Sequence, residues 1–310
     1  NMKISLTLIF TLLMIFLTSC SSAPSSSMQQ KIINLNVETN DKNKELIIES
    51  LLTNKQKFNI NFQDDNSYLL ENNVLNSKLK YFCKSFLDDQ KDLLEKSIFQ
   101  NKVNKDKNVL VIFSEEQTPL VNKLKKKYPS EDYYLIRKAN YETQIKKLLD
   151  IGSSSSRFLK LSQLDKNIEI SHTPRIKNNI SKIYFLMNYE IGKTIVPFFR
   201  SYAINLDFYS STEIFHDALD FKKLLDFEKT YIPITDKMIK NLSNKNSFNL
   251  QDNIAITLIN DYIEIEKIYQ HNLFRENFIP SSGNKIVKKN NCVKRDLNLW
   301  QISSDNFIQI

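Results

Sequence analysis

Short apolar runs alternate with longer segments of helical periodicity from about residue 31 to the end of the sequence. The apolar runs have the length of β-strands and fall at 32–37, 58–62, 109–113, 133–136, 183–187, 206–209 and 230–234. The periodic segments have the length of α-helices and fall at 43–54, 77–98, 116–128, 140–150, 190–203 and 252–270. Because strands and helices alternate, the pattern predicts parallel sheets covered by helices.

Three segments sharpen this prediction. Residues 109–113 are apolar throughout, which is typical of a strand covered on both faces. Near the end of the sequence, the apolar runs 297–302 and 307–308 flank a polar turn and predict an antiparallel hairpin. The last long helix is expected to bury the side that carries Ile254, Leu258, Tyr262, Ile265 and Tyr269.

The N-terminal apolar run has a different character. It covers residues 4–17 after Lys3, is interrupted only by Ser and Thr, and is shorter than the roughly 20 residues of a membrane-spanning helix. It fits the apolar region of a signal peptide, and it ends in Leu17-Thr18-Ser19-Cys20, which resembles the lipobox of bacterial lipoproteins. We therefore expect residues 1–19 to be a lipoprotein signal peptide. The alternative is an ordinary signal peptide that contains a cysteine.

Lipidation at Cys20 would fix the location of the chain. The Cys20 thiol takes a diacylglycerol, and the amine freed by cleavage before Cys20 takes an acyl chain such as palmitate. Each buried CH₂ of these chains contributes about 0.8 kcal/mol to anchoring. Ser21, rather than Asp, follows the cysteine, which favours the outer membrane under the usual sorting rule. Residues 20–30 are expected to be the lipidated cysteine and a polar tether, with a globular body at 31–310 facing the periplasm.

The composition agrees with a globular body, because 41% of the residues are hydrophobic and 25% are charged. The net charge of +8 comes mainly from Lys, and the chain has only 3 Gly. Abundant Lys, Asn and Ile with scarce Gly is typical of a genome rich in A and T, and the basic residues are scattered. We therefore expect no nucleic-acid partner.

Recognisable catalytic groups are missing from the sequence. The histidines, His172, His216 and His271, are far apart and have no partner at metal-ligand spacing. Neither a G-x-S-x-G motif nor a glycine-rich phosphate loop is present. The serines at 153–156 are interpreted as a link between a helix and the next segment. We expect no catalytic residue, no cofactor and no metal ion, and hence a protein that is not an enzyme.

Two adjacent carboxylates, Glu115 and Glu116, follow the apolar run 109–113. Open α/β sheets place ligand-binding groups at this end of their strands. Acidic residues are also favourable in the first turn of a helix, and we favour that second interpretation.

Several motifs from residue 109 onward resemble, in order, those of the penicillin-binding protein activator lipoproteins of the LpoA or LppC type. They comprise a helical segment with a Ser-rich, Arg-containing end at 145–157, Leu161-Ser162-Gln163-Leu164, and Thr173-Pro174-Arg175 before the run 180–186. They continue with Ile195-Val196-Pro197-Phe198-Phe199, Leu206-Asp207-Phe208-Tyr209-Ser210-Ser211, and a terminal hairpin at 283–286 and 293–300.

The resemblance implies the α/β fold of type I periplasmic binding proteins, with two doubly wound lobes joined by three crossings. Lobe one would cover about 31–107 and 236–280, and lobe two about 108–235 and 281–310. The residues that would line the cleft between the lobes are Ser114, Glu115, Asn188, Tyr189, Ser210 and Ser211. A disulfide requires close Cα atoms, and these lobes separate Cys83 from Cys292, so we expect both cysteines to be unpaired.

The resemblance also implies a function. The members of that family are outer-membrane lipoproteins that bind and activate a class A (bifunctional) penicillin-binding protein. They regulate peptidoglycan synthesis by protein contact rather than by chemistry. The alternative is a solute-binding lipoprotein of a transport system, because that class shares the two-lobed architecture. A solute binder needs convergent polar groups in a pocket that closes.

Overall fold

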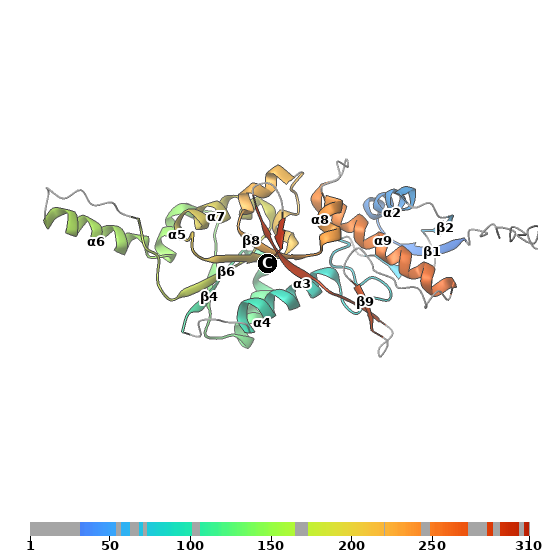
Figure 1. The fold of residues 1–310 in the computed structure, drawn as a ribbon, viewed down its shortest axis with the longest axis horizontal. Helices are drawn as coiled ribbons and strands as arrows, with labels where there is room; N and C mark the ends of the chain where they lie inside the picture. The colour runs from blue at the N-terminus through green and yellow to red at the C-terminus, as the bar shows by residue number, and fades with distance from the viewer. Residues whose placement is uncertain are drawn as a thin grey trace, which may run out of the picture.

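The structure, a computed structural model, describes residues 32–53, 57–62, 68–70, 73–100, 106–164, 173–219, 221–242, 249–271, 284–287, 292–303 and 307–309. The expected signal peptide, Cys20 and the tether lie outside these residues. Among the helices described, none has both the length and the apolar character needed to cross a bilayer. Figure 1 shows an elongated arrangement, with a large sheet near the centre, a smaller lobe beside it, and helix α6 (Ile151–Leu164) extending at the opposite end.

Seven strands form the large sheet, in the order β12-β11-β8-β7-β6-β4-β5. Five of them are parallel: β4 (Asn108–Phe113), β5 (Asp132–Leu135), β6 (Ile180–Leu186), β7 (Asp207–Ser210) and β8 (Thr230–Ile234). The antiparallel strands β11 (Asn298–Ile302) and β12 (Phe307–Gln309) continue the sheet beyond β8 and confirm the predicted hairpin. The sheet is therefore built outward in two directions from β4, its first strand in the chain.

Strand β4 is buried on both faces, as its apolar sequence predicted. Its side chains at 109, 111 and 113 join one core with the π-helix η1 (Lys96–Gln100) and helix α4 (Thr118–Lys127). Those at 110 and 112 join another core with α5 (Tyr141–Leu148) and α7 (Tyr189–Tyr202). Because alternate residues of a strand point to opposite faces, helices on both sides require an apolar residue at every position.

The smaller lobe contains a three-stranded parallel sheet. Strand β1 (Ile33–Glu38) lies between β2 (Phe58–Asn61) and β3 (Tyr68–Leu69), and α2 (Asp41–Thr53) connects β1 to β2. Helix α9 (Leu250–His271) packs against α2, α8 (Asp236–Leu242) and β1. Surrounded in this way, α9 buries more than the one predicted side. Its buried apolar residues include Ile254, Ile256, Leu258, Ile259, Tyr262, Ile263 and Ile265.

The chain passes between the two lobes three times. Helix α3 (Phe86–Glu95) leads from the smaller lobe to β4, and the chain returns from β8 to α8 and α9. It then passes through the hairpin of β9 (Asn284–Val287) and β10 (Cys292–Arg295) to β11. The predicted α/β fold, with two lobes joined by three crossings, is confirmed. The lobe boundaries at individual residues stay a prediction.

Two predicted segments were wrong in detail. The helix expected at 77–98 begins at Phe86, because Tyr81 has a left-handed φ of 72° and Ser85 caps the helix by accepting a hydrogen bond from the Asp88 amide at 3.1 Å. The serines at 153–156 lie inside α6 rather than in a link. Asp150, with φ 57°, separates α5 from α6, and its carboxylate accepts a hydrogen bond from Ser153 at 2.6 Å.

Two glycines in helices give a matched pair of stability predictions. A Cβ at Gly192 in α7 would lie 2.8 Å from Ile214 Cγ1 and 3.0 Å from Phe227 Cε1, both in the core, whereas a Cβ at Gly152 in α6 would meet nothing within 4 Å. We expect Gly192→Ala to lower the free energy of unfolding by about 1–3 kcal/mol through overpacking. We expect Gly152→Ala to raise it by up to about 1 kcal/mol. Urea unfolding of both variants measures these changes. Equal changes in the free energy of unfolding for the two variants would contradict the close packing at Gly192.

Candidate functional site

The carboxyl ends of the parallel strands form one edge of the large sheet, which we call the carboxyl edge. The order of the strands reverses between β4 and β6, and ligands of open α/β sheets bind where such a reversal occurs. Ser114 follows β4, Asn188 lies two residues after β6, and Ser210 ends β7. The structure thus brings most of the sequence-predicted cleft residues to one edge. Their role as ligand contacts stays a prediction.

Ser114 and Asn188 lie at the reversal itself. Ser114 is 2% exposed, and its hydroxyl has no hydrogen-bond partner among the described residues. Asn188 caps α7, because its Oδ1 accepts from the Ile191 amide at 3.2 Å, while its Nδ2 donates to the Glu116 carboxylate at 3.4 Å. Glu115 is exposed and lies with Glu116 in the first turn before α4, in agreement with the favoured helix interpretation.

The other predicted cleft residues have partners within the protein. The Tyr189 ring is 6% exposed and lies 5.9 Å from the Phe227 ring in the core. The Ser210 hydroxyl donates to the Phe185 carbonyl at 2.9 Å, and the Ser211 hydroxyl donates to the Glu213 carboxylate at 3.1 Å. These contacts give the three residues structural roles.

Gln90, on α3, closes the carboxyl edge at β7 and β8, and the sequence analysis missed it. Its side chain is fully buried, and its Nε2 donates to the Pro233 carbonyl at 2.6 Å. Its Oε1 accepts from the amide and the hydroxyl of Thr212, at 3.3 and 3.0 Å. A polar residue in an amphipathic helix gives no sequence signal for such contacts. The Gln90 amide therefore links α3 to the ends of β7 and β8, whereas the strand reversal lies between β4 and β6.

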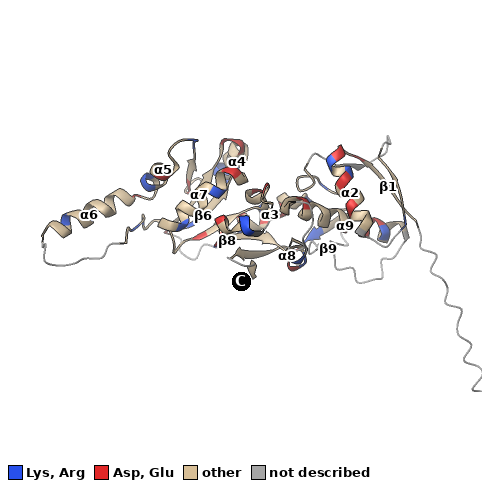
Figure 2. Cartoon of the chain, turned by 90° about the horizontal axis from the view of Figure 1, so that it is seen from above, with Lys and Arg blue, Asp and Glu red and all other residues tan. Residues whose placement is uncertain are grey.

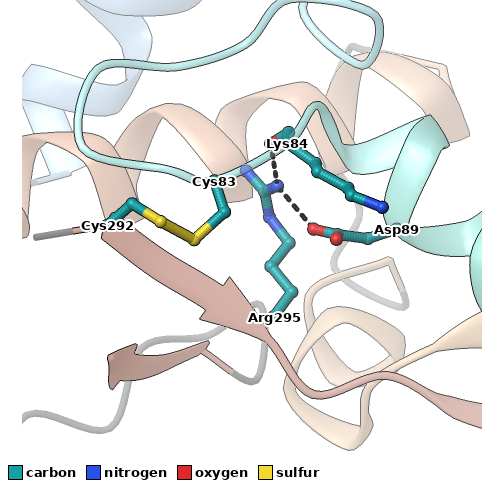
Figure 3. Close-up of a disulfide and its surroundings, with 5 residues drawn as sticks. All are labelled: Cys83, Lys84, Asp89, Cys292 and Arg295. Carbon is teal, nitrogen blue, oxygen red and sulfur yellow. Dashed lines mark hydrogen bonds and ion pairs between the residues drawn. A yellow bond between two sulfur atoms is a disulfide. The ribbon is translucent and has the colours of Figure 1, made fainter. Parts of the chain in front are cut away.

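A disulfide joins the first crossing to the third, contrary to the expectation of two unpaired cysteines. Cys83 and Cys292 are bonded, with Cα atoms 5.1 Å apart (Figure 3). The backbone supports this approach, because the Cys83 amide donates to the Val293 carbonyl at 3.0 Å and the Val293 amide to the Tyr81 carbonyl at 2.6 Å. Strand β10 runs beside residues 81–83, which the assignment of the cysteines to separate lobes did not anticipate.

An ion pair lies next to the disulfide. Arg295 Nη1 donates to Asp89 Oδ2 at 3.0 Å and to the Lys84 carbonyl at 2.9 Å (Figure 3). The Arg295 side chain is 0% exposed, and its guanidinium carbon lies 4.1 Å from the centre of the Phe82 ring. Burial raises the pKa of Asp89, and the Arg295 guanidinium opposes that shift. The third crossing is thus connected to the segment before α3 by a covalent bond at Cys83, and to α3 itself by a buried ion pair at Asp89.

The groups at the carboxyl edge are able to form hydrogen bonds with a ligand or a partner. No set of three or more His, Cys, Asp or Glu side chains suited to a metal ion occurs in the described part of the chain. His216 has its Nδ1 3.0 Å from the carboxylate of its neighbour Asp217, and His172 lies outside the described residues. The groups available at the carboxyl edge are hydroxyls, amides and one exposed pair of carboxylates, which form hydrogen bonds.

Comparison with known proteins gives structural likenesses only, since no family model and no curated protein sequence matches this chain. Full-length LpoA from Haemophilus influenzae is similar over 90% of this chain and 48% of its own, with a TM-score of 0.45 and 10% identity. The LpoA C-domain from the same organism, described as a regulator of PBP1A, is similar over 90% and 82%, with a TM-score of 0.42 and 11% identity.

A third similar structure is a possible leucine/isoleucine/valine-binding protein from Rhodopirellula baltica. It covers 92% of this chain and 98% of its own, with a TM-score of 0.46 and 7% identity. This chain spans about half the length of full-length LpoA. The similar structures thus include a regulator of a penicillin-binding protein and a solute-binding protein.

Proposed function

We propose that this chain is a lipid-anchored protein of the outer membrane, facing the periplasm, that acts by contact with another protein. The partner is a class A penicillin-binding protein, whose synthesis of peptidoglycan the chain stimulates. The observation that carries the contact mechanism is the bonding of the first crossing to the third through the Cys83–Cys292 disulfide, with Gln90 filling the carboxyl edge beside β7 and β8.

A solute-binding protein works by closing two lobes around its ligand, with the crossings as hinges. Here the first and third crossings share the Cys83–Cys292 disulfide and the Arg295–Asp89 ion pair, so they cannot move independently. This restraint favours a body that presents a fixed outer surface. The ordered sequence motifs, from 145–157 to the terminal hairpin, support the choice of a peptidoglycan synthase as partner.

The function is tested by the rate of glycan polymerisation. The full lipidated chain is added to a purified class A penicillin-binding protein from the same cells, and we expect the rate to rise with the concentration of the chain until it saturates. A heat-unfolded sample of the same chain is the control. An unchanged rate, together with no retention of the synthase on the immobilised chain, would refute the proposal.

The anchor is tested separately by lipid labelling. We expect cells grown with labelled palmitate to incorporate the label into the chain, and Cys20→Ser to abolish incorporation, because the thiol carries the diacylglycerol. Cys83→Ser is the matched control and should keep the label. Labelling that persists in Cys20→Ser would place the lipid elsewhere and remove the basis for the anchor.

A second candidate function, solute binding, is favoured by one observation, the buried hydroxyl of Ser114 at the strand reversal. A ligand at about 100 times its Kd should stabilise the chain by roughly 2.7 kcal/mol. On the contact mechanism, we expect no thermal shift with amino acids, dipeptides or tripeptides. We also expect Ser114→Ala to leave stability unchanged or raise it by up to about 1 kcal/mol, because a hydroxyl without a partner is removed. A ligand shift that Ser114→Ala abolishes would favour the second candidate.

A further inference from the structure

Helix α6 extends away from the large sheet at the end of the molecule opposite the smaller lobe (Figures 1 and 2). Three of its leucines are exposed: Leu159 by 57%, Leu161 by 57% and Leu164 by 82%. Leu161 and Leu164 are three residues apart and share one face of the helix. Large apolar side chains that are exposed side by side mark binding surfaces more often than isolated ones do.

A groove runs along α6, formed by two adjoining hollows that share Asp150 and Arg157. The first hollow, of about 590 Å³, lies between α6 and residues 173–178. Its apolar lining is Phe158, Leu161 and Ile176, and its cationic lining is Arg157, Arg175 and Lys177. The second hollow, of about 680 Å³, adds Lys147 and Lys160 from α5 and α6.

The charge of the groove is strongly unbalanced. Its cationic side chains are Lys147, Arg157, Lys160, Arg175 and Lys177, whereas Asp150 is its only carboxylate among the described lining residues. Lys146 also borders it but is paired with Glu142 at 2.7 Å. An occupant of this groove should therefore be acidic and should have apolar groups for the lining.

Hydrogen bonds fix the shape of the groove in the absence of any occupant. The Arg175 amide donates to the Ser154 hydroxyl at 2.9 Å, and the Lys177 amide donates to the Leu149 carbonyl at 3.1 Å. These bonds hold residues 173–178 against α5 and α6. A preformed groove lowers the cost of ordering on binding.

The concave shape of the surface favours a protein over a membrane. Phe158, Leu161 and Leu164 follow each other at a spacing of three residues and share one face of α6, whereas Leu159 points away from that face. Phe158 and Leu161 line the first hollow together with Ile176, so this face lies against a concave surface rather than a flat one. A concave surface with an apolar lining and a charged rim is typical of grooves that take an amphipathic helix of a protein.

We infer that the α6 groove binds an acidic amphipathic segment of a protein partner. The inference rests on the proposed function only in expecting that partner to be the synthase; the chemistry of the groove sets the acidic character independently. Arg157 lines both hollows and therefore lies at the centre of the binding surface.

The probe is a synthetic peptide with leucines at helical spacing and glutamates at its other positions, labelled for fluorescence anisotropy. We expect the full chain to bind it, more weakly as salt rises, and Arg157→Glu to weaken binding by about tenfold or more. Lys126→Glu, an exposed position on α4 with the same change in charge, should bind as the unaltered chain does. A peptide with lysine in place of glutamate should not bind. Equal binding by the two variants, or binding to anionic vesicles but not to the peptide, would overturn the inference.

The same variants separate this inference from the proposed function. If the synthase is stimulated by Lys126→Glu but not by Arg157→Glu, both are supported. If Arg157→Glu stimulates as well as the unaltered chain, the groove is the wrong surface and the function stands. If no form stimulates the synthase while the peptide binding depends on Arg157, the groove binds an acidic segment of another partner.

Discussion

Replacing Arg295 by methionine should lower the free energy of unfolding by about 3–5 kcal/mol, because it leaves the Asp89 carboxylate buried without its cation. Asp89 has a side-chain exposure of 8% and Arg295 of 0%, so water cannot substitute for the missing partner. Urea unfolding at neutral pH measures the effect. The exposed pair of Lys193 and Glu190 is the control, and Lys193→Met should cost less than about 1 kcal/mol.

Two further measurements identify the cause as an uncompensated charge. The double variant Arg295→Met with Asp89→Leu should regain most of the lost stability, because buried ion pairs are often replaced by apolar residues at little cost. Burial raises the pKa of Asp89 above its unfolded value, so the folded Arg295→Met chain should bind a proton more readily than the unfolded one. The loss in the free energy of unfolding should then become smaller as the pH falls through the pKa that Asp89 has in the folded state. A deficit that is independent of pH and persists in the double variant would contradict the ion pair.

Breaking the disulfide is expected to have the second large effect. Cys83 and Cys292 are 209 residues apart, so the bond restricts a very long loop of the unfolded chain, and its loss should cost about 2–5 kcal/mol. We expect the double variant Cys83→Ser/Cys292→Ser and the reduced chain to unfold at the same lower urea concentration. Mass spectrometry after alkylation in denaturant without reductant should show both cysteines unalkylated. Alkylation of both in the untreated chain would show that the bond is absent.

The sequence predicted the elements whose burial is regular. Residues 109–113 are apolar because both faces of β4 are covered. The ends of parallel strands share one edge, and Ser114, Asn188 and Ser210 lie at or just after the ends of β4, β6 and β7. The serines of α6 were misread because serine favours helix caps and turns over helix interiors, and the apolar helical spacing resumes only after Arg157.

What could not be predicted depends on contacts between segments distant in sequence. Gln90 fills the carboxyl edge only because α3 crosses it, with Thr212 more than a hundred residues further on. Arg295 stands in a short strand where a charged residue normally faces water, and its burial requires α3 and Phe82 beside it. The disulfide depends on the path of the third crossing, which apolar periodicity does not specify.

The central claim is that this chain acts by presenting a fixed surface to a synthase rather than by closing on a solute. The most direct test is the affinity of the full, oxidised chain for a purified class A penicillin-binding protein in buffer free of small molecules. We expect saturable binding with a Kd in the micromolar range or tighter, weakened about tenfold by Arg157→Glu and unaffected by Lys126→Glu. No binding of the synthase, together with a thermal shift of the chain by an amino acid, dipeptide or tripeptide, would contradict the account.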